Sequence, residues 1–291
     1  MSIKNWLRFL AVGVTWGTSF LWIKIALEEI GPLMVVAFRS SIGLVGMVLI
    51  LLFTNRKLLT WQNIKPWLGL FFLIGITNAA LPFVFISWGE QFIPSGIASV
   101  LISTTPLFTI LMVTFFMRED SITVTRAIGL MLGFGGVIVL FIPELRNSHL
   151  ENLFGLLAVL TAAASYALSG ILVRKKVHGL DSKLQVLMQY ITAALLVWML
   201  TFIFEKPITL PKLPLTWIAL LWLGLLGSSM GSFFHFQLIH SIGPTRTSAV
   251  AYVQPMVGVL LGAIILGEGF GWQTLMGGIL IVAGIMLVNR Q

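Results

Sequence analysis

The stretch from Pro32 to Phe53, PLMVVAFRSSIGLVGMVLILLF, decides the fold class of this chain. Arg39 is its one charged residue, and the run is long enough for a helix to cross the roughly 30 Å of hydrocarbon in a bilayer. Barrel strands alternate polar and apolar residues over about ten positions, and this stretch does not. The sequence therefore predicts a membrane-spanning helix here.

Nine further runs of similar length and apolarity flank this one, and the loops between them are short and carry Pro, Gly and charge. We therefore predict an all-α integral membrane protein with ten transmembrane helices. The predicted spans of the first half are Asn5–Leu27, Pro32–Phe53, Pro66–Trp88, Pro94–Met117 and Val124–Ile142. Those of the second half are Leu153–Val173, Leu184–Phe204, Leu215–Leu238, Thr245–Leu266 and Gly271–Val288.

Composition supports a membrane protein and excludes several other classes. Of the 291 residues, 58% are hydrophobic and 10% are charged, whereas a soluble domain carries roughly 25% charged residues. The net charge of +8 is spread over short loops rather than one basic face, so we exclude nucleic acid as a partner. The chain has no cysteine, and its four histidines and ten acids are scattered. We therefore predict neither a metal site nor a cofactor.

The placement of Lys and Arg predicts the orientation. If the N-terminus lies in the cytoplasm, thirteen of the 18 cations fall on the inner side and five on the outer side, as the positive-inside rule requires. The first apolar run follows Lys4 and Arg8 like a signal peptide, but it is too long and lacks a small-residue cleavage site. We expect a multi-pass protein of the bacterial inner (plasma) membrane with both termini in the cytoplasm.

The two halves of the chain resemble each other when one is shifted by 149 positions. This register, without a gap, aligns Gly75 with Gly224, Phe85 with Phe234, Ser99 with Ser248, Pro106 with Pro255, Glu119 with Glu268, and Gly135 with Gly284. We therefore predict two homologous units, residues 1–145 and 152–291. Each unit holds five spans, an odd number, so the second must be inverted in the membrane. Inverted repeats are a recurrent plan of secondary transporters.

Specific residues add a family resemblance that covers nearly the whole chain. The first span contains Trp16-Gly17-Thr18-Ser19-Phe20, followed by Lys24, Pro32 and Arg39, and each fourth span ends at a Glu that precedes a glycine-spaced fifth span. In this order the chain resembles the EamA-type branch of the drug/metabolite transporter superfamily, although it has Arg118 where that family more often has Gly. The resemblance implies ten helices around a central cavity, lined mainly by spans one, three, four, six, eight and nine. It also implies transport, commonly export, of amino acids or other small metabolites.

Polar and aromatic residues within the spans are the candidates for lining that cavity, because polar groups in hydrocarbon are costly and usually face protein or water. Aromatic walls with a few hydrogen-bonding groups suit a partly apolar, mid-sized solute. The alternative is that each hydroxyl bonds only to its own helix or a neighbour. The candidates are Trp16, Ser19, Trp22, Asn78, Phe85, Ser99, Ser103, Tyr166, Ser169, His235, Ser248 and Tyr252.

Charged residues and prolines near the spans have two interpretations each. Pro82, Pro106 and Pro255 lie within spans and either form hinges or kink their helices statically. His235 either binds substrate or packs. Lys24 and Arg39 either attract a carboxylate or, as we favour, snorkel to the headgroups or pair with an acid at the outer ends, Glu28, Glu29 or Glu90.

The duplicated acids Glu119 and Glu268 have a predicted structural role. Each stands between two spans, where a carboxylate can accept backbone N–H groups or favour the next helix dipole. No acid lies deep within any span, so the sequence does not support proton antiport through a buried carboxylate.

These patterns predict a secondary transporter of a small metabolite that works by alternating access and acts in export, as a monomer or as a dimer. A channel or facilitator for small solutes remains an alternative. An intramembrane enzyme is a remote one, because Gly227-Ser228-Ser229-Met230-Gly231 fits G-x-S-x-G only inside a helix, without an acid at depth. The chain is therefore not expected to be an enzyme, and its expected partners are a small-molecule substrate and the lipid bilayer.

Overall fold

The described part of the chain is built of helices, without a strand. A computed structural model describes residues 2–117, 123–147, 149–177, 179–242, 247 and 249–289. Eight apolar helical stretches are long enough to cross a membrane, and the last two helices are shorter. The long stretches are Ile3–Leu27, Pro32–Leu58, Trp61–Gly89, Ser95–Phe115, Val124–Leu145, Leu150–Lys176, Ser182–Phe204 and Pro214–Ile239, and the shorter helices are Val250–Ile265 and Trp272–Val288. The all-helical membrane architecture is as predicted.

Spans one and four are each broken into two helices. Span one consists of α1 (Ile3–Gly17) and α2 (Ser19–Leu27), and span four of α7 (Ser95–Ile102) and α8 (Thr105–Met117). The break in span four has a clear cause, since Pro106 lacks an N–H group and cannot bond to the carbonyl of Ile102. The Thr105 hydroxyl donates to that carbonyl instead, at 2.7 Å. Side chains thus satisfy the backbone where the helix is interrupted.

Spans three and eight each contain a π-helical segment at corresponding places. Segment η3 (Ile76–Ala80) lies between α5 (Leu68–Gly75) and α6 (Leu81–Gly89), and η4 (Trp222–Met230) lies between α12 (Pro214–Leu221) and α13 (Gly231–Ile242). Shifting η3 by 149 positions places it inside η4. π-Helical segments are rare and frequently lie at functional sites, so η3 and η4 are candidate locations of the functional site.

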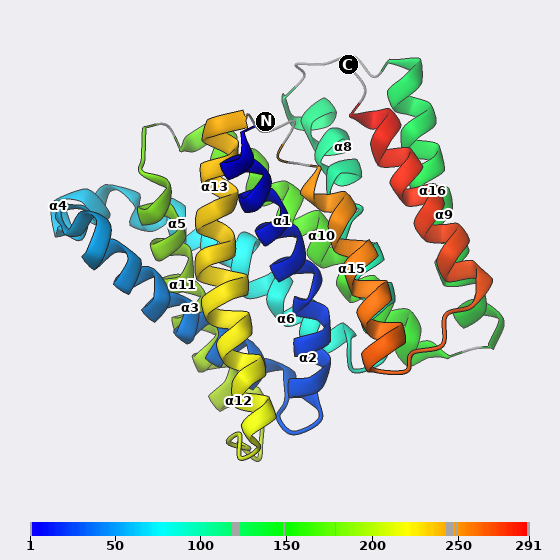
Figure 1. Cartoon of the computed structure of the whole chain (residues 1–291), viewed down its shortest axis with the longest axis horizontal. Helices are drawn as coiled ribbons and strands as arrows, with labels where there is room; N and C mark the ends of the chain where they lie inside the picture. The colour runs from blue at the N-terminus through cyan, green and yellow to red at the C-terminus, as the bar shows by residue number, and fades with distance from the viewer. Residues whose placement is uncertain are drawn as a thin grey trace.

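The remaining spans are single helices, and their pairing joins distant parts of the sequence (Figure 1). These are α3 (Pro32–Asn55), α9 (Val124–Asn147), α10 (Leu150–Lys176), α11 (Ser182–Phe204), α15 (Val250–Ile265) and α16 (Trp272–Val288). Helix α3 packs on α11, α10 on α6, and α1 on both α13 and α15. The short segments η1 (Arg56–Leu58), α4 (Trp61–Ile64) and η2 (Lys65–Trp67) connect α3 to α5.

Helices α9 and α16 lie side by side along their length (Figure 1). Their glycines allow backbone contact, because small residues let neighbouring helices approach closely. A Cβ atom added at Gly284 would lie 2.5 Å from the Gly129 carbonyl oxygen, and one at Gly136 would lie 2.6 Å from that of Gly277. No side chain larger than hydrogen fits at these positions without moving the helices apart.

The start of α1 and the end of α16 lie at the same end of the molecule, the upper end in Figure 1. The loops that join α2 to α3 and α15 to α16 lie at the opposite, lower end, as does the start of α12. We call this lower end the far end.

Candidate functional site

Arg39 lies inside the helix bundle, not at its edge. Its side chain is only 5% exposed. The guanidinium carbon stands 3.8 Å from the ring centroid of Phe83 in α6, and Nε donates a hydrogen bond to Ser228 Oγ in η4 at 3.1 Å. The prediction that Arg39 snorkels to the headgroups or pairs with an acid at the outer ends is therefore wrong. A snorkelling side chain has to leave the bundle, whereas this one is held between two helices.

Tyrosine and serine side chains complete the surroundings of Arg39. The Tyr190 ring in α11 stacks on Phe83 with centroids 6.5 Å apart. Its hydroxyl shares a hydrogen bond of 3.1 Å with Ser232 Oγ in α13. We call Arg39, Phe83, Tyr190, Ser228 and Ser232 the central cluster. It joins spans two, three, seven and eight, and none of its five members is among the predicted cavity residues, although Arg39 was considered as a group that could attract a carboxylate.

Three predicted cavity residues, Trp16, Ser19 and His235, come together beside the central cluster. Trp16 Nε1 donates to the main-chain carbonyl of Gly227 in η4 at 2.8 Å, and its ring lies 4.9 Å from that of His235. Ser19 Oγ is 3.1 Å from the position that a Cβ atom would take at Gly227. Spans one and eight thus meet where these three candidate residues are.

Other predicted cavity residues lie in neighbouring contacts. Trp22 stacks near Trp222 with ring centroids 5.6 Å apart. Asn78 Nδ2 in η3 donates to Gln189 Oε1 in α11 at 2.7 Å. Phe85 and Tyr166 are partly exposed and pack against the hydrophobic core.

The hydroxyls of span four bond within their own helix. Ser99 Oγ donates to the Gly96 carbonyl at 2.7 Å, and Ser103 Oγ donates to that of Val100 at 2.6 Å. Both side chains are buried. These contacts fit the alternative in which a serine serves its own helix.

The last predicted cavity residues have different surroundings. Ser169 is buried in α10, and its hydroxyl has no hydrogen-bond partner among the described residues. Tyr252 lies in α15, where its hydroxyl accepts a hydrogen bond from Asn289 Nδ2 at 3.0 Å. Ser248 and the predicted structural residue Glu119 lie outside the described residues, together with Arg118.

The three prolines lie at different kinds of position. Pro82 is the second residue of α6, directly after the π-helical η3, and is buried. Pro106 is the second residue of α8, at the break in span four. Pro255 lies inside α15, which continues through it. Pro106 is thus the one that coincides with an interruption of its span.

Glu268 caps a helix from the other half of the chain. Gly267 has a φ of 64°, a left-handed conformation that glycine adopts readily, and it turns the chain directly before Glu268. The Glu268 carboxylate accepts bonds from Ser95 N at 2.7 Å, Ser95 Oγ at 3.1 Å and Gly96 N at 3.1 Å. It does accept backbone N–H groups, as predicted for a structural role. However, the capped helix is α7, and not the helix that follows Glu268 in sequence.

Two further carboxylates cap helix starts in the same way. Glu205, which follows α11, accepts from the main-chain nitrogen of Leu33 in α3 at 2.7 Å. Glu29, which follows α2, accepts from Lys212 N, just before α12, at 2.6 Å. We call Glu29, Glu205 and Glu268 the carboxylate caps. Each links residues 1–145 to residues 152–291, and all three lie at the far end.

Glu90 is a fully buried carboxylate at the same end. It lies one residue beyond the stretch Trp61–Gly89, has no exposed surface, and neither carboxylate oxygen has a hydrogen-bond partner among the described residues. Lys24 Nζ approaches it but donates to the main-chain carbonyls of Glu90 and Ile93. Burial raises the pKa of Glu90 well above its usual value, although Lys24 acts in the opposite direction. The sequence prediction placed no acid within a span, and it missed this buried one at a span's end.

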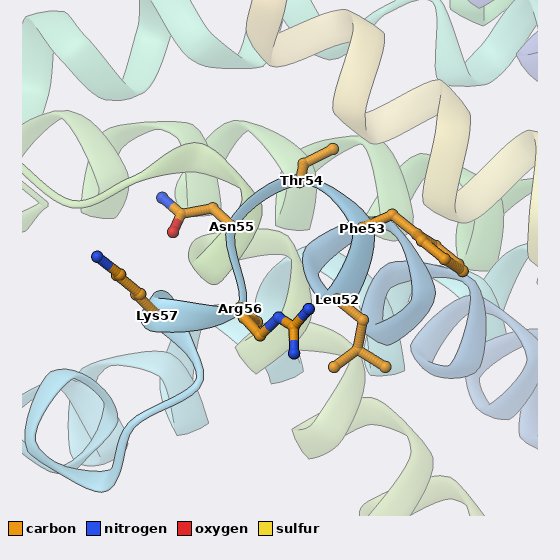
Figure 2. Close-up of a pocket in the computed structure, with 6 residues that line it drawn as sticks. All are labelled: Leu52, Phe53, Thr54, Asn55, Arg56 and Lys57. Atoms are coloured by element: carbon orange, nitrogen blue, oxygen red, sulfur yellow. The ribbon is translucent and has the colours of Figure 1, made fainter.

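Two recesses of the surface lie away from these contacts. One, of about 250 Å³, is lined by the six consecutive residues 52–57 at the end of α3, and Figure 2 shows their side chains spreading around that turn. The other, of about 330 Å³, lies between residues 58–67 and 179–184. Since one continuous segment lines the first pocket, it is a surface recess, and neither pocket contains a predicted cavity residue.

The G-x-S-x-G segment is packed into the fold. Ser229 is 1% exposed, and its hydroxyl donates to the main-chain carbonyl of Gly43 in α3 at 2.7 Å. His235 contacts Trp16 instead. This geometry gives Ser229 a packing role between η4 and α3.

Comparison with known proteins finds relatives over the whole chain. The EamA-like transporter family matches residues 6–142 and again residues 153–290. The "Uncharacterized transporter YoaV" of Bacillus subtilis is 26% identical over 98% of this chain and 96% of its own length. An "Uncharacterized transporter" of Archaeoglobus fulgidus is 28% identical over 99% of this chain and its full length. The "Uncharacterized inner membrane transporter YedA" of Escherichia coli is 28% identical over 91% of this chain and 82% of its own.

The fold also matches a protein of known crystal structure. The two superpose with a TM-score of 0.68, over 99% of this chain and 98% of the other, at 16% sequence identity. At this identity the match supports the fold alone.

Proposed function

This chain belongs to the EamA-like transporter family, and from that premise we propose that it is a secondary transporter that carries a small metabolite across the membrane by alternating access. The proposed direction is export, and the proposed location is a bacterial inner membrane with both chain ends in the cytoplasm. We also propose that one chain is the working unit.

The observation that carries this proposal is the position of the carboxylate caps. Glu29, Glu205 and Glu268 each bond a helix start in the other half, and all three lie at the far end. Charged caps at helix starts are stabilising, so these contacts hold the two halves together at that end. We assign the structure to a state closed on the far, outer side. Opening would break the caps and leave the two halves in contact at the other end.

The pairing of the helices supports an inverted repeat. Under the 149-position shift, the contact of α10 with α6 corresponds to that of α1 with α13, and the π-helical segments correspond as well. We therefore propose ten spans in two inverted units of five, residues 1–145 and 152–291. Two such units can exchange conformations, which makes the inward-open and outward-open states similar in free energy.

The proposal includes no bond-making chemistry. Ser229, the one serine in the position of a nucleophile, donates its hydroxyl proton to a backbone carbonyl in a packed contact, and a nucleophile needs an adjacent base instead.

A labelling experiment tests alternating access directly. The chain has no cysteine, so Ser95→Cys places a single thiol at the start of α7, where Ser95 is fully buried. In proteoliposomes sorted by orientation, a membrane-impermeant maleimide should label it slowly and only from the outer side. Glu268→Gln in the same chain should speed the labelling. Equal labelling with and without that substitution would contradict closure by the caps.

Counterflow then separates a transporter from a channel. Proteoliposomes loaded with an identified substrate should accumulate labelled substrate against its gradient. In a channel the labelled and unlabelled substrate equilibrate independently, and no transient accumulation occurs. The absence of this accumulation would contradict the proposal.

A further inference from the structure

The charge of Arg39 is buried and left without a partner ion. A guanidinium stays protonated in proteins, and burying an unpaired charge is strongly unfavourable. Among the described residues no carboxylate lies within ion-pair distance of Arg39. Glu90 acts on it from further away, and the largest electrostatic partner of Glu90 is Lys24.

Most of the hydrogen-bonding capacity of Arg39 is also unused. A guanidinium carries five N–H donors in a planar fork. Nε is bonded to Ser228, while neither terminal nitrogen has a hydrogen bond to a described residue. The free edge of this fork matches the two oxygens of a carboxylate, which binds a guanidinium through two parallel bonds.

The absence of a side chain at Gly227 leaves space beside Arg39 Nη2. A Cβ atom at Gly227 would lie 4.0 Å from Arg39 Nη2 and 3.1 Å from Ser19 Oγ. Trp16 bonds to the carbonyl of the same Gly227. Two predicted cavity residues of span one, Trp16 and Ser19, therefore lie at Gly227, the residue beside Arg39 Nη2.

The walls around the charge are flat and aromatic. Phe83 lies under the guanidinium and stacks on Tyr190. Aromatic walls of this kind bury a large apolar area and favour stacked or edge contacts with another ring. A solute with one ring or another flat apolar part fits these walls.

The central cluster carries one positive charge, that of Arg39, and can therefore balance one negative charge. Lys24 in span one is bonded to the carbonyls of Glu90 and Ile93, so its ammonium group is engaged away from Arg39. An ammonium group would need an acceptor, and both Glu90 oxygens are sealed from any space around them. A monoanion without an amino group satisfies the site better than a zwitterion or a phosphate.

We propose that Arg39 binds the carboxylate of the transported solute, and that the substrates are small monocarboxylates with an aromatic or other flat apolar part. This inference rests on the proposed function, because it names the substrate class of that transporter. The central cluster is then the binding site, and the π-helical η4 supplies both Ser228 and the room at Gly227.

Three matched probes test the proposal: 3-phenylpropionate, 3-phenylpropionamide and 3-phenylpropylamine, which share a skeleton and differ in charge. Each is titrated into the purified full chain, and binding is measured by calorimetry and by the shift in Tm. The anion should bind and raise Tm, while the neutral amide and the amine should not. Equal binding of the anion and the amide would overturn the proposal.

Substitutions then assign the binding to Arg39. Arg39→Gln should raise the Kd of the anion by roughly 30-fold or more, since losing one partner of a buried charge pair costs this much. Arg39→Lys keeps the charge without the fork and should give a smaller increase. Lys183→Gln is the matched control, because Lys183 also lies near an aromatic ring, that of Phe233 at 5.9 Å, but on an exposed surface. Unchanged binding in Arg39→Gln would contradict the proposal.

The Tm of the protein without ligand distinguishes a binding role of Arg39 from a structural one, because the two roles predict opposite changes in Arg39→Gln. If the partner of Arg39 is the anionic ligand, Arg39→Gln removes a charge that is unpaired in the ligand-free protein. The substitution should then raise the Tm without ligand by a few degrees. A lower Tm with unchanged anion binding would assign Arg39 to packing. If Arg39→Gln does not fold, Gly227→Ala, which fills the space beside the guanidinium and keeps the charge, should weaken anion binding alone.

The outcomes for site and function are separable. Anion binding without counterflow would leave the site standing and refute the transporter. Counterflow of the amine or of phenylalanine, with no binding of 3-phenylpropionate, would keep the transporter and refute the anion site.

Discussion

The Glu268 carboxylate accepts a hydrogen bond from the main-chain nitrogen of Ser95 at 2.7 Å, although 173 positions separate the two residues. The bond joins the loop after α15 to the start of α7, so it connects the two halves of the chain. Gly267, in a left-handed conformation, turns the chain just before this contact. The turn at Gly267 thus positions Glu268 to bond a helix in the other half of the chain.

Replacing Glu268 with Gln should weaken this closure without changing the size of the side chain. The neutral amide loses the charge that favours the helix start, and we expect a loss of about 1–2 kcal/mol in the free energy of unfolding. Thermal unfolding in detergent measures the change. Glu28→Gln is the control, because Glu28 is an exposed acid at the same end. An equal loss in both variants would show that net charge alone is responsible.

The buried Glu90 predicts a pH dependence of stability. Its pKa is raised in the folded protein from the ordinary 4.5, so the folded state holds the proton to higher pH than the unfolded state does. By linkage, stability is then lost as pH rises from 4.5 through the raised pKa. Glu90→Gln should remove this loss, and its Tm should exceed that of the wild type increasingly as pH rises. A constant difference across pH would mean that Glu90 ionises as freely as in the unfolded chain.

The glycine contact between α9 and α16 predicts a steep cost for one added methyl group. In Gly284→Ala the new Cβ would lie 2.5 Å from a backbone oxygen of α9, so the helices must separate, at a cost of about 1–3 kcal/mol. Gly135→Ala is the matched control, since a Cβ there meets nothing within 4 Å. Similar Tm values for the two variants would contradict the close contact.

Aromatic residues outside the central cluster should affect transport more than folding. Trp22→Ala removes the ring that faces Trp222, and Tyr252→Ala removes the phenol whose hydroxyl accepts a hydrogen bond from Asn289 Nδ2. We expect a roughly tenfold loss of flux for each, equivalent to about 1.4 kcal/mol, at equal amounts of folded protein. Trp61→Ala is the control, because Trp61 is 63% exposed. If both variants transport fully, Trp22 and Tyr252 do not line the pathway.

The helical membrane architecture could be predicted because hydrophobic run length alone determines it. Arg39 shows where such reasoning ends. A lone cation in the apolar stretch of residues 32–53 is a visible signal, but its distance from the end of the run does not tell whether it reaches outward or inward. That depends on Phe83 and Ser228, which lie in other spans.

The π-helical segments and the carboxylate caps could not be predicted from the sequence, for a different reason. The 149-position shift aligned the regions of η3 and η4 without indicating their geometry, because a π-turn follows from packing rather than from local preference. Glu205 looked like a loop residue, and its capping of α3 is a contact between distant segments. Ser99 and Ser103 were visible as polar positions, but their bonds to their own helix appear only in three dimensions.

The glycine contact of α9 with α16 also constrains how the protein is made. Helix α9 is the last of the first five spans, yet its Gly129 and Gly136 face α16, the last helix that the structure describes. During synthesis the glycine face of α9 is therefore exposed to lipid until α16 has been made and inserted. Truncation before α16 should therefore leave even the completed first half vulnerable to quality-control proteases.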